Sequence, residues 1–245
     1  MIESLGFIII GLLFLILVAI VFFNRKRYKT LENDIFTILL LYTLFISVLG
    51  ILCTLTMANH LKIPVLNEVL CRIYVLGIIA WMSLILAYLW SLGRNSKYEK
   101  TSQILKERYI KSLFVFTIVT YIVSLFYDLT FTSVYNDSVY IIGGEGKFAL
   151  YSFVVIMVVS ILYILLVKKR DIPLSRRLPL FFFVFYLIVV SILQLTIYDF
   201  NDLTYLYCLC VIAIYFSIEN PDVQLIERLR ETNKNAERAF KNRTD

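Results

Sequence analysis

The sequence predicts an all-helical membrane protein: a bundle of seven transmembrane helices followed by a short cytoplasmic helix. Three observations predict this fold. Hydrophobic residues make up 60% of the 245 residues and charged residues only 17%, whereas a soluble domain has roughly 45–50% apolar and 25% charged residues. The apolar residues gather in seven runs. Lys and Arg are concentrated in alternate segments between those runs, as in proteins that cross a membrane several times.

Most of the seven runs have the length that a membrane-spanning helix needs, about 20 residues at 1.5 Å per residue. The first run resembles a signal peptide in its position, but its charge is reversed, because Glu3 precedes it and Arg25-Lys26-Arg27 follows it. We therefore interpret it as a retained span. The runs lie at about 5–23, 34–57, 67–92, 111–129, 148–167, 178–198 and 203–218, and the last is short.

The basic residues predict the orientation of the bundle. Twenty-one of the 24 Lys and Arg residues fall in or beside the segments that follow the first, third, fifth and seventh runs, and the others are Lys62, Arg72 and Lys147. Because cytoplasmic loops retain Lys and Arg, we expect the N-terminus outside and the C-terminus inside. The net charge of +6 therefore indicates sidedness, and no nucleic-acid partner is expected.

The longest outer connection has the pattern of a short β-hairpin. Its two β-rich stretches are separated by Asn136-Asp137, which suits a tight turn, and Gly143, Gly144 and Gly146 lead into the fifth span. Such a hairpin would either cover a cavity from the outer side or act as a connector without a ligand. The two stretches are Thr130–Tyr135 and Val139–Ile142.

Ionisable and aromatic side chains near the outer ends of the spans are the candidates for ligand binding, because such groups are costly in a membrane unless they serve a function. Glu68 and Arg72 are four residues apart on one helix face, where they can pair. The helix-end tyrosines and aspartates have an alternative role as interface anchors. The acidic outer mouth favours a cationic or peptide ligand, although a lipid or bilayer cue stays open. The candidates are Glu68, Arg72, Tyr127, Asp128, Gln194, Tyr198 and Asp199.

The interior of the spans looks apolar. Apart from scattered Ser and Thr, Gln194 is the main polar residue, and no pair of helices broken by Gly or Pro marks a transport site. A small transporter or channel is therefore the alternative rather than the leading hypothesis. Gly50 and Gly77 suit close contact between helices, and Trp81 suits packing.

No catalytic constellation, metal site or cofactor motif is expected. The sequence lacks the phosphate-loop, zinc-protease and serine-hydrolase motifs. The single histidine, His60, lies in an outer loop, where we expect it to be solvated. Cys53 and Cys71 flank that loop and would be able to pair, but buried free thiols are the favoured interpretation for these two and for Cys208 and Cys210.

The polar tail after the seventh span has the features of a separate helix. Asn220 suits the N-cap and Pro221 the first helical position. The following apolar and small residues recur at spacings of three and four, as in a two-heptad coiled coil in which a buried Asn fixes the register of a dimer. A solitary solvated helix is the alternative, because two heptads are few. The seam consists of Ile226, Leu229, Asn233, Ala236 and Phe240.

The tail also carries a resemblance. The runs Ile218–Glu227 and Asn235–Asp245 resemble the stretch that joins the last membrane helix of seven-span bacterial sensor histidine kinases to their catalytic part. The resemblance extends more weakly to the membrane region, through its span number and its hairpin-like loop. The phospho-accepting Ser-His-Glu motif of that family and its ATP-binding domain are absent from these 245 residues.

The resemblance implies a sensory input module in a bacterial cell membrane. Residues 1–218 would form the transmembrane sensor and residues 219–245 the signalling helix, which would dimerise and act on downstream kinase domains and a response regulator. The full-length protein would then be a histidine kinase, although this chain has no catalytic residues of its own. An input module of a nucleotide cyclase is a further alternative.

Overall fold

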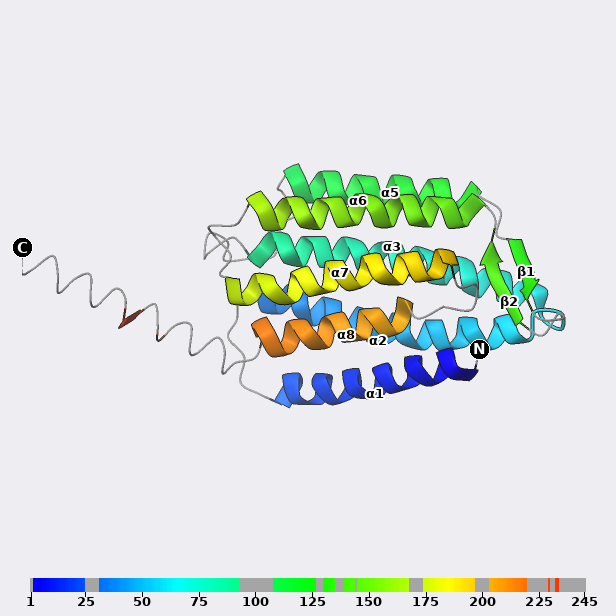
Figure 1. Cartoon of the computed structure of the whole chain (residues 1–245), viewed down its shortest axis with the longest axis horizontal. Helices are drawn as coiled ribbons and strands as arrows, with labels where there is room; N and C mark the ends of the chain where they lie inside the picture. Colours follow the sequence, from blue (N-terminus) through cyan, green and yellow to red (C-terminus); the bar gives the residue numbers. More distant parts are fainter. Residues whose placement is uncertain are drawn as a thin grey trace, which may run out of the picture.

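The described part of the chain forms a bundle of long helices with a pair of antiparallel strands, seen in a computed structural model (Figure 1). The structure describes residues 2–24, 31–92, 108–126, 130–134, 139–143, 145–167, 174–196, 203–219, 229 and 232–233. Its elements are α1 (Ile2–Asn24), α2 (Leu31–Ala58), α3 (Pro64–Leu92), α5 (Arg108–Phe126), β1 (Thr130–Val134), β2 (Val139–Gly143), α6 (Glu145–Val167), α7 (Leu174–Thr196), α8 (Leu203–Ile214) and the π-helix η1 (Tyr215–Glu219).

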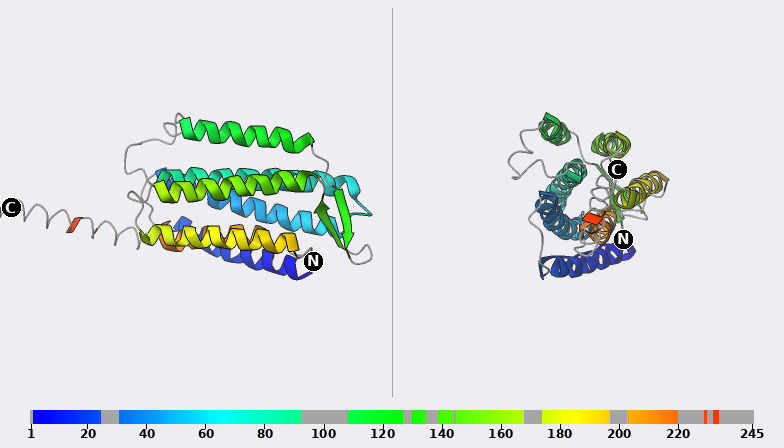
Figure 2. Two further views of the ribbon diagram at one scale, coloured as in Figure 1. Left: turned by 45° about the horizontal axis from the view of Figure 1, so that its top comes forward. Right: turned by 90° about the vertical axis from the view of Figure 1, so that its left-hand side faces the viewer.

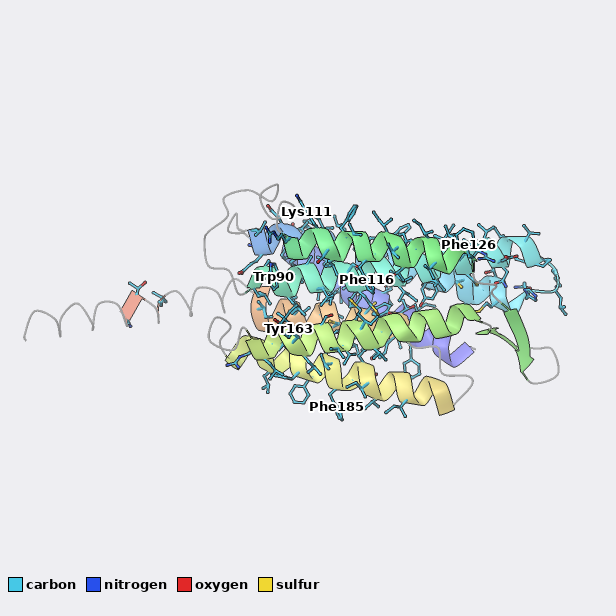
Figure 3. The ribbon with its side chains drawn as sticks, turned by 90° about the horizontal axis from the view of Figure 1, so that it is seen from above. Trp90, Lys111, Phe116, Phe126, Tyr163 and Phe185 are labelled. Carbon is cyan, nitrogen blue, oxygen red and sulfur yellow. The ribbon has the colours of Figure 1, made fainter. Side chains whose placement is uncertain are left out.

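The helices lie side by side along one long axis, and most of them are seen nearly end-on in the right-hand view of Figure 2. The strands β1 and β2 lie at one end of this bundle, which we call the hairpin end. The end at which α8 passes into η1 is called the opposite end. Figure 3 shows Phe126 at the hairpin end of α5 and Lys111 near the opposite end of the same helix.

Three helices within the described ranges are long and apolar enough to cross a membrane, namely α1, α2 and α3. The apolar stretches described in the other four helices are shorter, at 111–123, 154–166, 180–189 and 204–218. Large apolar side chains also cover the outside of the bundle, among them Leu13 and Phe14 on α1 and Phe185 on α7. Such a surface is unfavourable in water, because each exposed apolar side chain costs free energy there. Contact with lipid removes this cost. Length and surface together indicate a membrane protein.

Helix α3 lies at the centre of the packing. Its most extensive contact is with α2, and it also packs against α5 and α6, while α8 packs against α1, α2 and α7. Trp81 and Tyr88 of α3 are fully buried, as are Phe36 of α2 and Tyr207 of α8. The core therefore follows α2, α3 and α8, and α5 lies at its edge.

Two glycines allow α8 to approach its neighbours closely. A Cβ atom on Gly11 of α1 would lie 2.9 Å from Cδ2 of Tyr205 and 3.2 Å from Cβ of Cys208. A Cβ atom on Gly50 of α2 would lie 2.7 Å from Oγ1 of Thr204. Small residues at helix contacts let backbones approach in membranes, so the packing expected for Gly50 agrees with its position against α8.

The two strands pair in the antiparallel direction, with Thr130 opposite Gly143 and Val134 opposite Val139. Strand β2 contacts α2 and α6. The turn expected at Asn136-Asp137 lies outside the described residues. Gly143 ends β2 and Gly146 lies in the first turn of α6, whereas Gly144 lies outside the described residues.

Candidate functional site

At the hairpin end, α3 begins with an ion pair on its surface. Nη2 of Arg72 lies 2.8 Å from Oε1 of Glu68, and Nε of the same arginine donates to this oxygen at 3.0 Å. The four-residue spacing puts both side chains on one face of the helix. Nη1 of Arg72 also donates to the carbonyl oxygen of Leu125, in the last turn of α5, at 3.4 Å. Arg72 therefore connects α3 to α5.

This pair is the part of the predicted pocket that the described residues bring together. Gln194 lies in the last turn of α7, and its side chain is outside the described part of the structure. The other four candidates, Tyr127, Asp128, Tyr198 and Asp199, also lie outside the described residues.

His60 lies in the α2–α3 connection, as expected, but it is only partly exposed and its side chain also has a partner. Nδ2 of Asn67, a fully buried residue, lies 2.9 Å from Nδ1 of His60. Sγ of Cys71 donates to Oδ1 of Asn67 at 3.5 Å. Sγ of Cys53 lies 2.9 Å from Sγ of Cys71. The side chains of four residues are thus in contact one after another, from the α2–α3 connection into the adjoining turns of both helices. We call them the His60–Cys53 chain: His60, Asn67, Cys71 and Cys53.

Both cysteines of this chain are buried free thiols, as are Cys208 and Cys210 on α8. This agrees with the favoured interpretation from the sequence. The thiols of Cys53 and Cys71 are nevertheless in direct contact, which the sequence left open.

A second set of polar side chains lies deeper in the bundle, where α8 meets α2 and α3. The hydroxyl oxygens of Tyr74 and Thr204 are 2.5 Å apart, and Oγ of Ser47 lies 3.1 Å from Sγ of Cys208. Nε1 of Trp81 donates to Oγ1 of Thr43 at 2.7 Å. The Trp81 ring stacks on the ring of Tyr207, with centroids 4.3 Å apart. We call these seven residues the α8 polar cluster: Thr43, Ser47, Tyr74, Trp81, Thr204, Tyr207 and Cys208.

The α8 polar cluster shows that some of the scattered Ser and Thr of the spans, Thr43, Ser47 and Thr204, gather with other polar side chains at one place. Sequence reasoning missed it because a hydroxyl in a membrane helix can bond to its own backbone and needs no other partner. Thr43, Ser47 and Thr54 do donate to the carbonyl oxygens four residues earlier. A signal was present in the spacing of Thr43, Ser47, Gly50 and Thr54, which places small polar residues on one face of α2.

Polar contacts also tie α5 to α3. Oγ of Ser83 lies 2.7 Å from Oγ1 of Thr117, and the hydroxyl of Tyr121 donates to the carbonyl oxygen of Leu76 at 2.7 Å. Together with Arg72, these bonds attach α5 along the length of α3. Helix α3 therefore has hydrogen-bonded partners on α2, α5 and α8.

The described residues contain no group of three or more His, Cys, Asp or Glu side chains that would hold a metal ion. The α8 polar cluster consists of neutral hydroxyl, thiol and indole groups. Such groups hold helices in a defined arrangement, because a bond between helices replaces an unsatisfied polar group in an apolar surrounding.

Helix α8 ends in the π-helix η1, whose turn holds one more residue than an α-helical turn. Beyond it, Leu229, Thr232 and Asn233 are helical and exposed in the single chain. The other tail positions named from the sequence, Asn220, Pro221, Ile226, Ala236 and Phe240, lie outside the described residues.

Comparison with models of known protein families and with curated proteins finds no match for this chain.

Proposed function

We propose that the chain is the membrane-embedded input module of a signalling protein. It would pass a signal from the hairpin end through α3 and α8 into a dimeric cytoplasmic helix. The observation that carries the proposal is the α8 polar cluster, which ties the helix leading to the tail to the central helix α3. A change in the packing of α3 would then act directly on α8.

Helix α3 is suited to this role by its contacts. Near its start it carries Asn67 and Arg72, whose partners lie in the α2–α3 connection and on α5. Two residues after Arg72, Tyr74 bonds to Thr204 of α8. A displacement at the hairpin end therefore has a short path, through side chains in contact, to the helix that leads to the tail.

The proposal includes seven membrane spans with the N-terminus outside. The charge pattern of the sequence supports this orientation, and the seven helices of the described ranges lie side by side as such a bundle requires. The hairpin end would then face outward. The Glu68–Arg72 pair would lie at the outer mouth, available to an extracellular or membrane-borne cue.

Signalling would consist of a shift between two packings of the bundle. Hydrogen bonds between membrane helices contribute about 0.6 kcal/mol each on average. Bonds of this strength can be exchanged by a ligand whose affinities for the two packings differ by only a few kcal/mol. The η1 turn would adjust its hydrogen bonds as α8 moves.

Crosslinking at the tail tests this coupling in the full chain. A Leu229→Cys variant places a thiol at the predicted dimer seam, while the four native thiols are buried. We expect zero-length oxidative crosslinking to give a covalent dimer, and less dimer from Thr232→Cys, which lies beside the seam. Adding Tyr74→Phe should change the Leu229→Cys yield by at least about twofold, because α8 loses a tie to α3.

The matched control for Tyr74→Phe is Tyr163→Phe, which removes an exposed hydroxyl on α6. If the crosslinking yield is the same for wild type, Tyr74→Phe and Tyr163→Phe backgrounds, α8 does not transmit through this contact. If Leu229→Cys gives no dimer, the dimeric helix is wrong.

A small transporter or channel is the second candidate, and one observation favours it. The hydroxyl of Tyr207, which is fully buried within the α8 polar cluster, has no hydrogen-bond partner among the described residues. A buried hydroxyl with spare bonding capacity is able to bond a passing solute. Solute or ion flux in liposomes that contain the chain, lost in Tyr207→Phe, would support transport over signalling.

The output domain belongs to the proposal as well. The resemblance of the tail favours a histidine kinase, and a nucleotide cyclase is the other candidate. The coding sequence that follows Asp245 separates them, because a Ser-His-Glu motif within a few codons would identify the kinase.

A further inference from the structure

The thiols of Cys53 and Cys71 form the closest contact between cysteines in the described residues. Their sulfur atoms are 2.9 Å apart. A disulfide bond is about 2.05 Å long, so the two atoms need to approach by less than about 1 Å. The side chains are buried, with exposed fractions of 1% and 0%.

The fold brings these residues together and keeps them there. Cys53 lies near the end of α2 and Cys71 near the start of α3, and the short connection between the helices holds both at the hairpin end. Backbone hydrogen bonds from Lys62 and Ile63 to Asn59 fix that connection. The two thiols are therefore held as neighbours rather than meeting by chance.

We propose that Cys53 and Cys71 form a reversible redox pair, which a small disulfide oxidant converts into a covalent link between α2 and α3. The Cys71 thiol loses its proton, attacks one sulfur of the oxidant and releases one thiol. The Cys53 thiol then attacks the mixed disulfide at Cys71 and releases the second thiol. The pair gives up two electrons and two protons, and the oxidant becomes two thiols.

Asn67 is the positioning residue for this pair. Its Oδ1 accepts a hydrogen bond from Sγ of Cys71, while its Nδ2 is bonded to His60. Its fully buried amide therefore orients the Cys71 sulfur next to Cys53. Cys208 and Cys210 provide an internal comparison, because residues two apart on a helix point to different faces and do not pair.

Oxidation would lock the hairpin end of α2 to α3. Arg72 follows Cys71 in the chain and is bonded to α5, and Tyr74 is bonded to α8. A disulfide between Cys53 and Cys71 would thus limit the movement of α3, which contacts both α5 and α8. The redox pair goes beyond the proposed sensory role and does not depend on it.

The test uses the full chain in mild detergent with 4,4′-dithiodipyridine, an apolar disulfide small enough to reach buried thiols. We expect two pyridinethiones to be released per Cys53–Cys71 pair. The unreduced digest should contain linked α2 and α3 peptides whose mass is lower by two hydrogen atoms, and a reductant should separate them. Cys53→Ser should stop at a pyridylthio adduct on Cys71.

Three results would overturn the proposal. One is that Cys53 and Cys71 both remain free, as judged by alkylation after denaturation. Another is that both carry separate adducts. The third is a linked peptide that contains Cys208 or Cys210. Asn67→Ala should slow the second step and leave more adduct, while Asn59→Ala, at an exposed side chain, should not. The main measurement, the linked peptide, is made on the wild-type chain. The test therefore remains valid if a variant fails to fold.

Discussion

Tyr74 and Thr204 are 130 residues apart in the sequence, yet their hydroxyl oxygens lie 2.5 Å apart in the buried contact between α3 and α8. Thr204 is also the residue that a Cβ atom on Gly50 would strike first. Three helices thus meet at one threonine hydroxyl. A substitution at Gly50, Tyr74 or Thr204 should therefore alter the packing of the other two residues.

A double-mutant cycle measures the Tyr74–Thr204 bond. Tyr74→Phe and Thr204→Val should each lower the free energy of unfolding, because each leaves a buried hydroxyl partner unpaired. The double variant should lose less than the sum, by a coupling energy of about 0.6–1.7 kcal/mol. Unfolding in mixed micelles by SDS titration provides the measurement, and additive effects would contradict the bond.

Two glycines on the same helix give a matched comparison. Gly11→Ala should lower the free energy of unfolding by about 1–3 kcal/mol, because the new methyl group overpacks the contact of α1 with α8. Gly6→Ala should leave stability unchanged or slightly raised, since nothing lies within 4 Å of its added Cβ atom. The same SDS titration reads both. Equal effects of the two substitutions would show that α1 does not pack against α8 as described.

The Glu68–Arg72 pair should contribute little to stability. Glu68→Gln should cost less than about 0.5 kcal/mol, because the pair is exposed and its charges are screened by salt. Arg72→Gln should cost more, since it also removes the bond to the carbonyl of Leu125 that joins α3 to α5. Unfolding at low and high salt tests both expectations. If Arg72→Gln has no larger effect than Glu68→Gln, the contact with α5 is unimportant.

Thiol labelling tests the proposed orientation. Leu61 lies in the α2–α3 connection and is 73% exposed, so Leu61→Cys should react with a membrane-impermeant maleimide added outside intact cells. Leu229→Cys should react only after the membrane is opened. The wild type serves as the blank, because its four thiols are buried. The opposite pattern would reverse the topology.

The sequence predicted the helices well for a clear physical reason. Each apolar run must satisfy its backbone hydrogen bonds internally if it lies in lipid, and only a helix does so within one segment. The run predicted at 111–129 corresponds to α5 at Arg108–Phe126, and the run at 203–218 to α8 with η1. The exact ends of β2 and α6 were not predicted, because Gly143 and Gly146 have little conformational preference of their own.

The polar contacts were not predictable in the same way. Glu68 and Arg72 can be found from the sequence, because a charged side chain in a membrane segment costs free energy and therefore indicates a function. Tyr74, Thr204 and Ser47 cannot be found in this way, because Tyr, Thr and Ser are common in apolar helices and the partners of these three lie far away in the sequence. The His60–Asn67 contact was missed because a loop histidine ordinarily has water as its partner.

The η1 turn has a consequence for changes in chain length. Because a π-helical turn holds one residue more than an α-helical turn, deletion of a single residue from Tyr215–Glu219 can be absorbed by a return to α-helical geometry. All residues that follow would then keep their direction relative to α8. An inserted residue cannot be absorbed in this way, and it would rotate the residues that follow by about 100° relative to α8. The chain should therefore accept the loss of one residue here far more readily than the gain of one.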